Sequence, residues 1–487
     1  MSRVVDDLLG WADRTPDAPF LIEEVGTVHT YADVLSRARR FAGGLGALGV
    51  SETERVLLLL PNGMDFLAAY YGTLLVGGTV VGLQPMTPRA TLDYVVSSCR
   101  PALCVTDGRP REGGGAATVT PISEIVGATS YGGPAVGSAD SIAQIIYTSG
   151  TTGMPKGVTL SHRALRANTS GIVEYLELGS SDRVGVVLDF VYSYGNSLLQ
   201  THCRVGGSLA LLGDMVFPAQ VATLLGEREC TGFSGVPSTF ALLLKRGRLE
   251  GQSLRTLRYL TCAGGSLPPA NLRRLQRLLP DVQVYPMYGQ TEAAARLSYL
   301  PPVQLDRRPD SIGQGMPGVT LEVLMADGRR AEAGEEGEIV ASGENLMSGY
   351  WEDAVATGEV LRNGKLWTGD LARIDEEGFI YITGRRSDLI KTGAYRVHPK
   401  EIEQALVSMS GVHECVVVGV PDEVWGEVVV ACFPRGTAPA LPAARKHLRG
   451  VLPEYKWPRQ VMEVDELPRT ASGKPRRKEL VRILTSA

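Results

Sequence analysis

The chain has 487 residues, and because a single hydrophobic core stops growing at roughly 250–300 residues, at least two domains are expected. Its 49 basic and 53 acidic side chains leave a formal net charge of −4, which argues against a nucleic-acid-binding protein with a basic surface. The seven cysteines form no Cys-x-x-Cys pair, which favours reduced thiols in a cytoplasmic protein over a disulfide framework.

The N-terminal segment lacks the apolar stretch of a secretory signal peptide. Residues 66–83 form an uncharged run that is long enough to be considered as a membrane span. Gly77 and Gly78 interrupt this run, and Thr73 and Thr79 make it more polar. We therefore expect a buried helix, a glycine turn and a strand here, and no membrane partner.

Strand and helix patterns alternate through the first three quarters of the chain. The short apolar runs 55–60, 79–83 and 101–106 favour strands, whereas 64–76 is long enough for a helix. This βαβ alternation predicts an α/β fold with parallel sheets covered by helices.

The most informative segment is 147–158, which reads Tyr-Thr-Ser-Gly-Thr-Thr-Gly-Met-Pro-Lys-Gly-Val and follows an apolar strand-like run. Glycines let backbone N–H groups point inward, hydroxyl groups add donors, and a lysine adds positive charge, so the loop suits phosphate groups. It is not the common P-loop, because Pro155 and Gly157 flank the lysine. The expected phosphate-binding residues are Thr148, Ser149, Gly150, Thr151, Thr152, Gly153 and Lys156.

The character of the chain changes twice towards its C-terminus. Residues 321–340 read as short strands joined by tight turns, which predicts a small antiparallel part. After Arg385, a helix is expected over 399–408 and paired strands over 415–420 and 427–433. We predict a large N-terminal domain over 1–385 and a small α+β C-terminal domain over 386–487.

Five segments, in order along the chain, resemble motifs of the adenylate-forming superfamily, which includes acyl-CoA and aryl-CoA synthetases, adenylation domains of nonribosomal peptide synthetases, and luciferase. They are the 147–158 loop, a nucleotide motif at 288–292, a ribose motif at 368–370, a hinge at 384–391 and a lysine motif at 468–474. The resemblance implies that the C-terminal domain is mobile and that ATP and Mg²⁺ are the cofactors.

The resemblance also implies a role for each matching residue. Lys474 would bridge the attacking carboxylate and the phosphate. Thr291 would donate a hydrogen bond to the α-phosphate. Glu292 would hold Mg²⁺, which prefers oxygen ligands. Asp370 would accept hydrogen bonds from the ribose hydroxyls, and Arg385 would assist at the ribose or the phosphate. The other nucleotide-binding residues implied are Ala263, Gly264, Gly265, Tyr288 and Gly289. Taken alone, 474–478 also reads as a basic tail patch.

Segment 190–196 matches the family's aromatic substrate-pocket motif, so Tyr192, Tyr194 and Asn196 are expected to line the acid pocket. No acidic residue occurs between Phe190 and Asn196 to pair with an α-amino group, which predicts an acid without one. Arg296, four residues after Glu292, faces either the pocket or the surface, and of these two alternatives we expect the surface.

These features predict an AMP-forming ligase that activates an aryl or short- to medium-chain carboxylic acid and transfers it to the thiol of CoA or the phosphopantetheine of a carrier protein. Ser387 and Ala394 depart from the family's hinge and thiol-entry patterns. Two alternatives therefore stay open: an adenylating enzyme with a non-thiol acceptor or an unusual oxyanion or amine substrate, and a catalytically dead nucleotide-binding relative.

Overall fold

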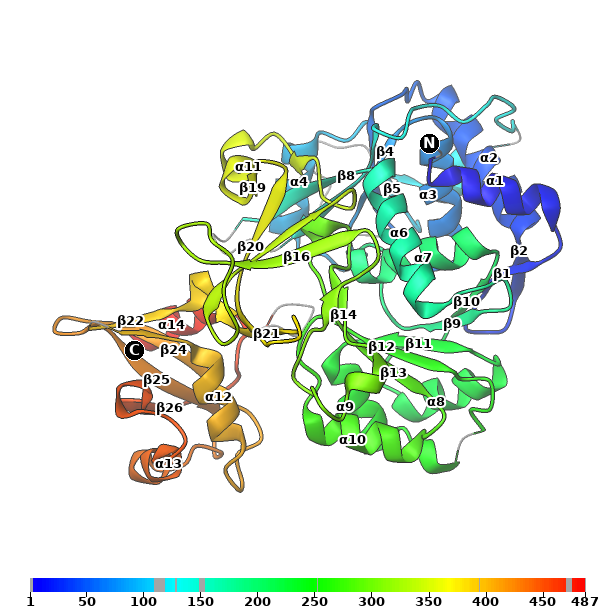
Figure 1. Cartoon of the computed structure of the whole chain (residues 1–487). Helices are drawn as coiled ribbons and strands as arrows, with labels where there is room; N and C mark the ends of the chain where they lie inside the picture. Colours follow the sequence, from blue (N-terminus) through cyan, green and yellow to red (C-terminus); the bar gives the residue numbers. More distant parts are fainter. Residues whose placement is uncertain are drawn as a thin grey trace. The chain divides into compact units, whose positions relative to one another are not determined.

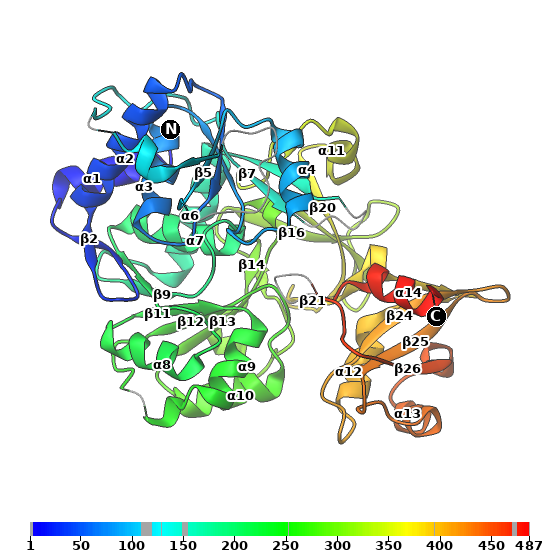
Figure 2. The same ribbon diagram turned by 180° about the vertical axis from the view of Figure 1, so that it is seen from behind.

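The computed structural model describes residues 3–108, 119–127, 129–148, 154–251, 253–393, 395–469 and 475–486. The chain divides into two compact units, the first formed by Met1–Leu321 with Ala341–Leu366 and the second by Glu322–Val340 with Trp367–Ala487 (Figures 1 and 2). The divisions fall inside strands β16 (Val319–Leu324), β17 (Glu336–Gly343) and β20 (Lys365–Ile374). A functional domain boundary near Arg385 stays a prediction.

One large sheet of the first unit is parallel at its centre and antiparallel at its ends, in the order β15-β14-β13-β12-β11-β9-β10-β1-β2. Its strands are β1 (Pro19–Ile22), β2 (Val28–Thr30), β9 (Arg183–Val186), β10 (Ser208–Leu211), β11 (Gly232–Gly235), β12 (Tyr259–Cys262), β13 (Gln283–Tyr288), β14 (Ser298–Tyr299) and β15 (Gln314–Gly315).

The other large sheet of this unit has the order β18-β8-β7-β4-β3-β5-β6, with parallel pairing from β7 to β6 and antiparallel pairing of β8 with both of its neighbours. Its strands are β3 (Arg55–Leu59), β4 (Thr79–Gly82), β5 (Leu103–Thr106), β6 (Val119–Pro121), β7 (Ile142–Thr148), β8 (Lys156–Ser161) and β18 (Gly349–Tyr350).

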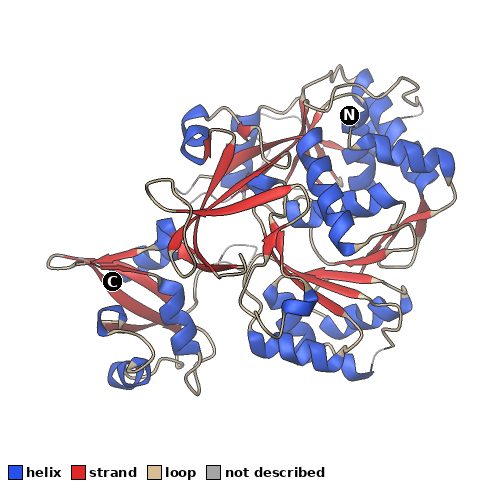
Figure 3. Cartoon of the chain, in the orientation of Figure 1, coloured by secondary structure: helices blue, strands red, loops and turns tan. Residues whose placement is uncertain are grey.

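Helices flank both sheets of the first unit (Figure 3). Two of them lie between the sheets, since α6 packs against β8 while α7 packs against α6, β9 and β10. The α-helices are α1 (Val5–Arg14), α2 (Tyr31–Ala47), α3 (Met64–Leu75), α4 (Arg89–Cys99), α5 (Ile122–Ile125), α6 (His162–Leu176), α7 (Ser193–Val205), α8 (Pro218–Glu227), α9 (Pro237–Arg246), α10 (Pro269–Leu278) and α11 (Ala354–Val360). The predicted α/β fold is confirmed.

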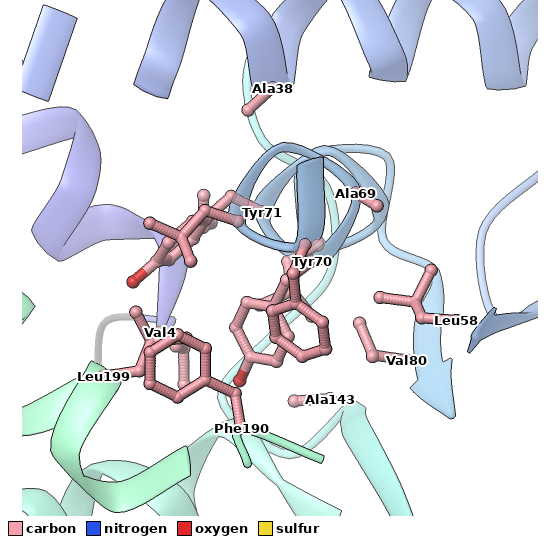
Figure 4. Close-up of a cluster of buried hydrophobic side chains, with 14 of the residues drawn as sticks. Val4, Ala38, Leu58, Ala69, Tyr70, Tyr71, Val80, Ala143, Phe190 and Leu199 are labelled. Carbon is pink, nitrogen blue, oxygen red and sulfur yellow. The ribbon is translucent and has the colours of Figure 1, made fainter. Parts of the chain in front are cut away.

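The apolar run 66–83 lies in the core of the first unit as most of α3, a glycine turn and β4. Tyr70 projects from α3 toward Phe190, and the Phe66 and Phe190 ring centroids are 5.7 Å apart (Figure 4). Burial on every side explains why the segment is uncharged. No helix among the described residues is long and apolar enough to cross a membrane.

The second unit combines helices with mainly antiparallel strands, as predicted for an α+β domain. Strands β20 and β21 (Ile380–Arg385) pair antiparallel. A further sheet has the order β23-β22-β25-β24, with β26 beside β25. The remaining elements are β19 (Leu361–Arg362), β22 (Ile390–Thr392), β23 (Tyr395–Val397), β24 (Val416–Asp422), β25 (Gly426–Pro434), β26 (Gln460–Val464), α12 (Pro399–Val407), α13 (Leu441–Leu448) and α14 (Arg477–Ser486), of which β19 belongs to the first unit.

All seven cysteines are buried and free, and burial raises the pKa of each thiol described in the core, Cys203 and Cys262 included. They behave as small apolar core residues and form no disulfide. This agrees with the expectation of reduced thiols, and the cytoplasmic location stays a prediction.

Asp182 directly precedes β9 and is buried, at 4 % exposure. It accepts hydrogen bonds from residues of neighbouring segments. Its carboxylate accepts hydrogen bonds from Thr231 Oγ1 at 2.7 Å, from Gly179 N at 2.8 Å and from the Arg258 guanidinium at 2.9 Å. Burial alone would raise the pKa of Asp182, but these hydrogen bonds hold it below the ordinary value.

We expect Asp182→Ala to lower the free energy of unfolding by about 2 kcal/mol at neutral pH, because it leaves buried donors unpaired. The lowered pKa means that this contribution is complete above the unfolded-state pKa, near 3.9, and is lost as the pH falls below it. Urea unfolding at pH 7 and at pH 3.5 checks both statements. Asp140→Ala, which removes an exposed partner of Arg163, is the control and should lower the stability much less than Asp182→Ala does, because exposed ion pairs contribute little. An equal loss in both variants would contradict the argument.

Candidate active site

The predicted phosphate-binding loop joins two adjacent strands of the seven-stranded sheet. Thr148, the last residue of β7, lies opposite Lys156, the first residue of β8, in an antiparallel pair. Thr148 Oγ1 is 3.5 Å from the Lys156 carbonyl oxygen, a long hydrogen bond. The two ends of the loop are therefore fixed by strand pairing, while Ser149, Gly150, Thr151, Thr152 and Gly153 lie outside the described residues.

Lys156 and Glu292 approach each other through a tyrosine from a distant part of the chain. Lys156 Nζ lies 4.9 Å from the centre of the Tyr350 ring, and Tyr350 OH donates a 2.8 Å hydrogen bond to Glu292 Oε1. Burial raises the pKa of Tyr350 and the Glu292 charge adds to the rise, so the phenol is a neutral donor. Strand β18, which carries Tyr350, pairs antiparallel with β8 and fixes this position.

Tyr350 contacts two predicted site residues, and the sequence motifs did not reveal it. It lies 58 residues after Glu292, in a segment without a recognisable pattern, and only the pairing of β18 with β8 brings it to Lys156. No signal in the sequence marked it.

Thr291 and Glu292 lie in a tight turn after β13. Gly289 precedes the turn, and a Cβ atom there would lie 1.9 Å from the Ala295 carbonyl oxygen, so only glycine fits. A 3-10 helix over Thr291–Ala293 follows, and Thr291 Oγ1 is 3.3 Å from Ser193 Oγ on α7. This contact places the predicted α-phosphate donor beside the predicted acid pocket.

Glu292 suits a magnesium ion that also binds phosphate oxygens. Its Oε1 atom is occupied by Tyr350, which leaves the second carboxylate oxygen for a cation. Magnesium is usually held by one or two carboxylates together with substrate phosphates and water. The described residues contain no cluster of three or more metal-ligating side chains.

The predicted adenine segment follows β12 and lies at the same sheet edge as the end of β13, because these strands are parallel neighbours. Ala263 is buried and Gly264 has φ +87°, a left-handed conformation that favours glycine. Ligands of open α/β sheets bind outside the carboxyl ends of the strands. Ala263, Gly264, Gly265, Tyr288 and Gly289 all lie at or just beyond such ends.

The three predicted pocket residues lie at the start of α7 and face different ways. Tyr192 is 40 % exposed. Tyr194 OH is 2.9 Å from both the carbonyl oxygen and Oγ1 of Thr261, at the end of β12. Asn196 is 2 % exposed, and its amide oxygen accepts from Gln200, one turn along the same helix. Tyr194 thus points to the edge where the adenine segment begins, and the pocket roles of all three stay predictions.

Arg296 is buried, at 1 % exposure, so the expectation that it faces the surface is wrong. The 3-10 helix that carries Glu292 ends at Ala293, and Ala294 adopts φ +62°. The chain then turns inward, and the Arg296 guanidinium carbon lies 4.2 Å from the centre of the Tyr194 ring.

In the second unit, Asp370 and Arg385 lie opposite each other in the β20–β21 pair. Arg385 Nε donates to Asp370 Oδ1 at 3.0 Å, and Asp370 is 4 % exposed. The structure thus brings together the two residues predicted at the ribose, and that role stays a prediction. Lys474 lies outside the described residues.

Lys156→Ala is expected to lower kcat/KM for pyrophosphate formation from ATP by about 100-fold, because it removes a cation where the leaving phosphates would carry negative charge. The fold should persist, since the Lys156 side chain is only partly buried. Pyrophosphate release with a saturating acid is the measurement, and Lys245→Ala, which removes an exposed lysine of α9, is the control. If Lys156→Ala turned over ATP at the native rate, the assignment of this loop to phosphate binding would be wrong.

Comparison with known proteins places the chain among AMP-binding enzymes. The family model "AMP-binding enzyme" matches residues 9–351, and "AMP-binding enzyme C-terminal domain" matches 401–474. The chain is 32 % identical to feruloyl-CoA synthase from Amycolatopsis sp over 92 % of both chains. It is 33 % identical to sulfoacetate–CoA ligase from Cupriavidus necator over 96 % of both chains.

Among solved structures, the chain is similar to o-succinylbenzoate coenzyme A synthetase from Bacillus subtilis in complex with ATP and magnesium. The TM-score is 0.88 and the identity 26 %, over 97 % of this chain and 98 % of that one. The similarity therefore extends through both units of the chain.

Proposed function

We propose a reaction for this chain from the premise that it belongs to the AMP-binding enzyme family: it is an ATP-dependent, AMP-forming acid–CoA ligase. A carboxylate oxygen attacks the α-phosphorus of ATP and pyrophosphate leaves. The thiolate sulfur of CoA then attacks the carbonyl carbon of the acyl adenylate, and AMP leaves as the thioester forms.

The observation that carries the proposal is the contact chain from Lys156 through Tyr350 to Glu292, next to Thr291. Three segments far apart in the sequence meet there and supply a cation, a neutral donor and a carboxylate. Adenylation needs such groups where negative charge develops on the phosphates. A catalytically dead relative has no need to keep them together.

Each predicted site residue is proposed to have its own role in the adenylation step. Lys156 and the loop 148–153 would bind the leaving phosphates, Thr291 would donate to the α-phosphate, and Glu292 would hold Mg²⁺. When bound, the ion neutralises phosphate charge. Lys474 would hold the attacking carboxylate against the phosphate, and Asp370 with Arg385 would bind the ribose.

The acid is proposed to lack an α-amino group. Segment 190–196 supplies no carboxylate to pair with an ammonium, and the buried cation of Arg296 beside Tyr194 would repel one. An unpaired buried ammonium costs several kcal/mol. The named relatives act on feruloyl and sulfoacetyl groups, which supports an aryl or short-chain acid here.

The acceptor is proposed to be CoA, and a carrier-protein phosphopantetheine is the second candidate because the two share the same thiol arm. Ser387 and Ala394 depart from the family pattern at the hinge and thiol entry. The thiol step therefore needs its own measurement.

The test is pyrophosphate release with ATP, Mg²⁺ and a panel of benzoates, cinnamates, short fatty acids, diacids and the twenty amino acids, followed by mass spectrometry of products formed with CoA or a holo carrier protein. We expect AMP, pyrophosphate and an acyl thioester from acids without an α-amino group. Preference for an α-amino acid would contradict the substrate proposal. Pyrophosphate release without any thioester would leave adenylation standing and contradict the thiol acceptor.

A further inference from the structure

We propose that Arg296 binds a second negatively charged group of the acid, so that the preferred substrates are dicarboxylic or sulfocarboxylic acids of which one carboxylate is activated. This inference rests on the proposed function and names its substrate class. Its carrying observation is a buried guanidinium without a protein counter-charge at the edge of the predicted acid pocket.

The guanidinium of Arg296 is enclosed by uncharged groups. Its carbon lies 4.2 Å from the Tyr194 ring centre, and its Nε is 2.9 Å from Met287 Sδ. Among the described residues, no Asp or Glu oxygen lies within ion-pairing distance of it. Burial raises the pKa of Tyr194 and of Tyr175, so both phenols are neutral and supply no negative charge.

Several other buried or half-buried arginines of this chain have acidic partners. Arg166 is 2.7 Å from Asp7, and Arg477 forms an ion pair with Glu403. Arg258 gives the closest comparison, because it also stacks on a tyrosine, 5.0 Å from the Tyr259 ring centre, yet it is 2.9 Å from Asp182. These three arginines have acidic partners, whereas Arg296 has none among the described residues.

An unpaired buried charge is unfavourable unless a ligand pairs with it. Removing a charge from water costs more free energy than stacking on a tyrosine face returns. A thioether is only a weak acceptor. A guanidinium presents a planar fork of donors that matches the two oxygens of a carboxylate or sulfonate. An anionic substrate group therefore supplies what the protein lacks.

The backbone holds Arg296 rigidly in this place. Its carbonyl oxygen accepts hydrogen bonds from Asn168 Nδ2 at 2.9 Å and from Asn345 Nδ2 at 3.1 Å. Both asparagines are buried. These bonds fix the main chain at Arg296, and the Tyr194 ring and Met287 Sδ contact its guanidinium. A side chain placed in this way can bind an anion with a reduced ordering cost, which favours selective recognition.

The position relative to the reacting groups sets the geometry of the substrate. Tyr194, on which Arg296 stacks, follows Ser193, whose hydroxyl is 3.3 Å from Thr291, the predicted α-phosphate donor. Tyr194 OH also reaches Thr261, two residues before the adenine segment. An acid with one carboxylate at Thr291 would therefore direct its other end past Tyr194 toward Arg296.

The experiment compares acids that differ only in the second group. Pyrophosphate release is measured with benzoate, 3-carbamoylbenzoate, benzene-1,3-dicarboxylate and 3-sulfobenzoate, and with linear three- to six-carbon diacids beside their monoacids. The native chain is expected to prefer a dianion over its matched monoacid. Arg296→Met should lower the ratio of kcat/KM for dianion over monoacid by roughly 10- to 100-fold, since hydrogen bonds to charged groups contribute about 1.5–3 kcal/mol.

Two further variants keep the test decisive. Arg296→Lys retains the charge without the fork and should recover part of the ratio, and it serves if Arg296→Met fails to fold. Arg258→Met removes a stacked arginine that has its own acid and should leave the ratio unchanged. As a readout without turnover, the dianion should raise the melting temperature of the native chain more than its monoamide does.

The outcomes are separable. The native chain, Arg296→Lys and Arg296→Met could adenylate acids with the same ratio of kcat/KM for dianion over monoacid. That result would overturn this inference and leave the proposed function standing. If no acid is adenylated by the native chain, the proposed function itself fails and the inference fails with it.

Discussion

Lys474→Ala is expected to reduce adenylate formation by at least about 1,000-fold while leaving the reaction of a pre-made acyl adenylate with CoA nearly unchanged. A compact ammonium that bridges the attacking carboxylate and the α-phosphate stabilises charge only in the adenylation step. The later attack of a thiol on the adenylate breaks the bond between carbonyl and phosphate and does not need that bridge. Removal of Lys474 should therefore separate the two half-reactions.

The measurement has two arms. Pyrophosphate release reports the first half-reaction, and loss of free CoA thiol with synthetic acyl adenylate reports the second. Lys478→Ala removes another lysine of the same basic segment 474–478 and should leave both arms near native rates. Equal loss in both arms for Lys474→Ala, or equal loss in the two variants, would favour a basic patch over a reacting lysine.

Glu292→Gln is expected to lower the rate of pyrophosphate release by about 100- to 1,000-fold, because it removes the carboxylate charge proposed to hold Mg²⁺. The amide oxygen of glutamine can still accept the hydrogen bond from Tyr350 OH, which is 2.8 Å long in the native chain. The substitution therefore removes charge while keeping the local packing. A higher Mg²⁺ concentration for half-maximal rate should accompany the loss.

Tyr350→Phe is the matched control, since it removes the hydrogen bond to Glu292 and keeps both the ring near Lys156 and the carboxylate charge. Its rate should fall by only about 10-fold, the value of one ordinary hydrogen bond. A magnesium titration of pyrophosphate release distinguishes the variants. If Glu292→Gln showed the native dependence on Mg²⁺ concentration, the proposal that Glu292 binds Mg²⁺ would be wrong.

Local patterns predicted the elements that carry their own signals. The run 66–83 became most of α3 and then β4, and 399–408 became α12 (Pro399–Val407), within a residue or two of the expected bounds. The predicted family is confirmed by the matched family models. Loop residues such as Gly289 were visible because the backbone of a tight turn restricts the residue type.

Long-range pairing decided the rest. Tyr350 reaches Glu292 through the pairing of β18 with β8, and no local pattern encodes which distant strand a segment will join. Arg296 looked like a surface residue because charge usually stays in water. Its burial follows from a turn that ends after three residues and from two asparagines on other elements that hold its carbonyl. Functions that depend on the residue types of a short segment could therefore be predicted from the sequence. The partners of a buried charge could not, because they are set by contacts between segments far apart in the sequence.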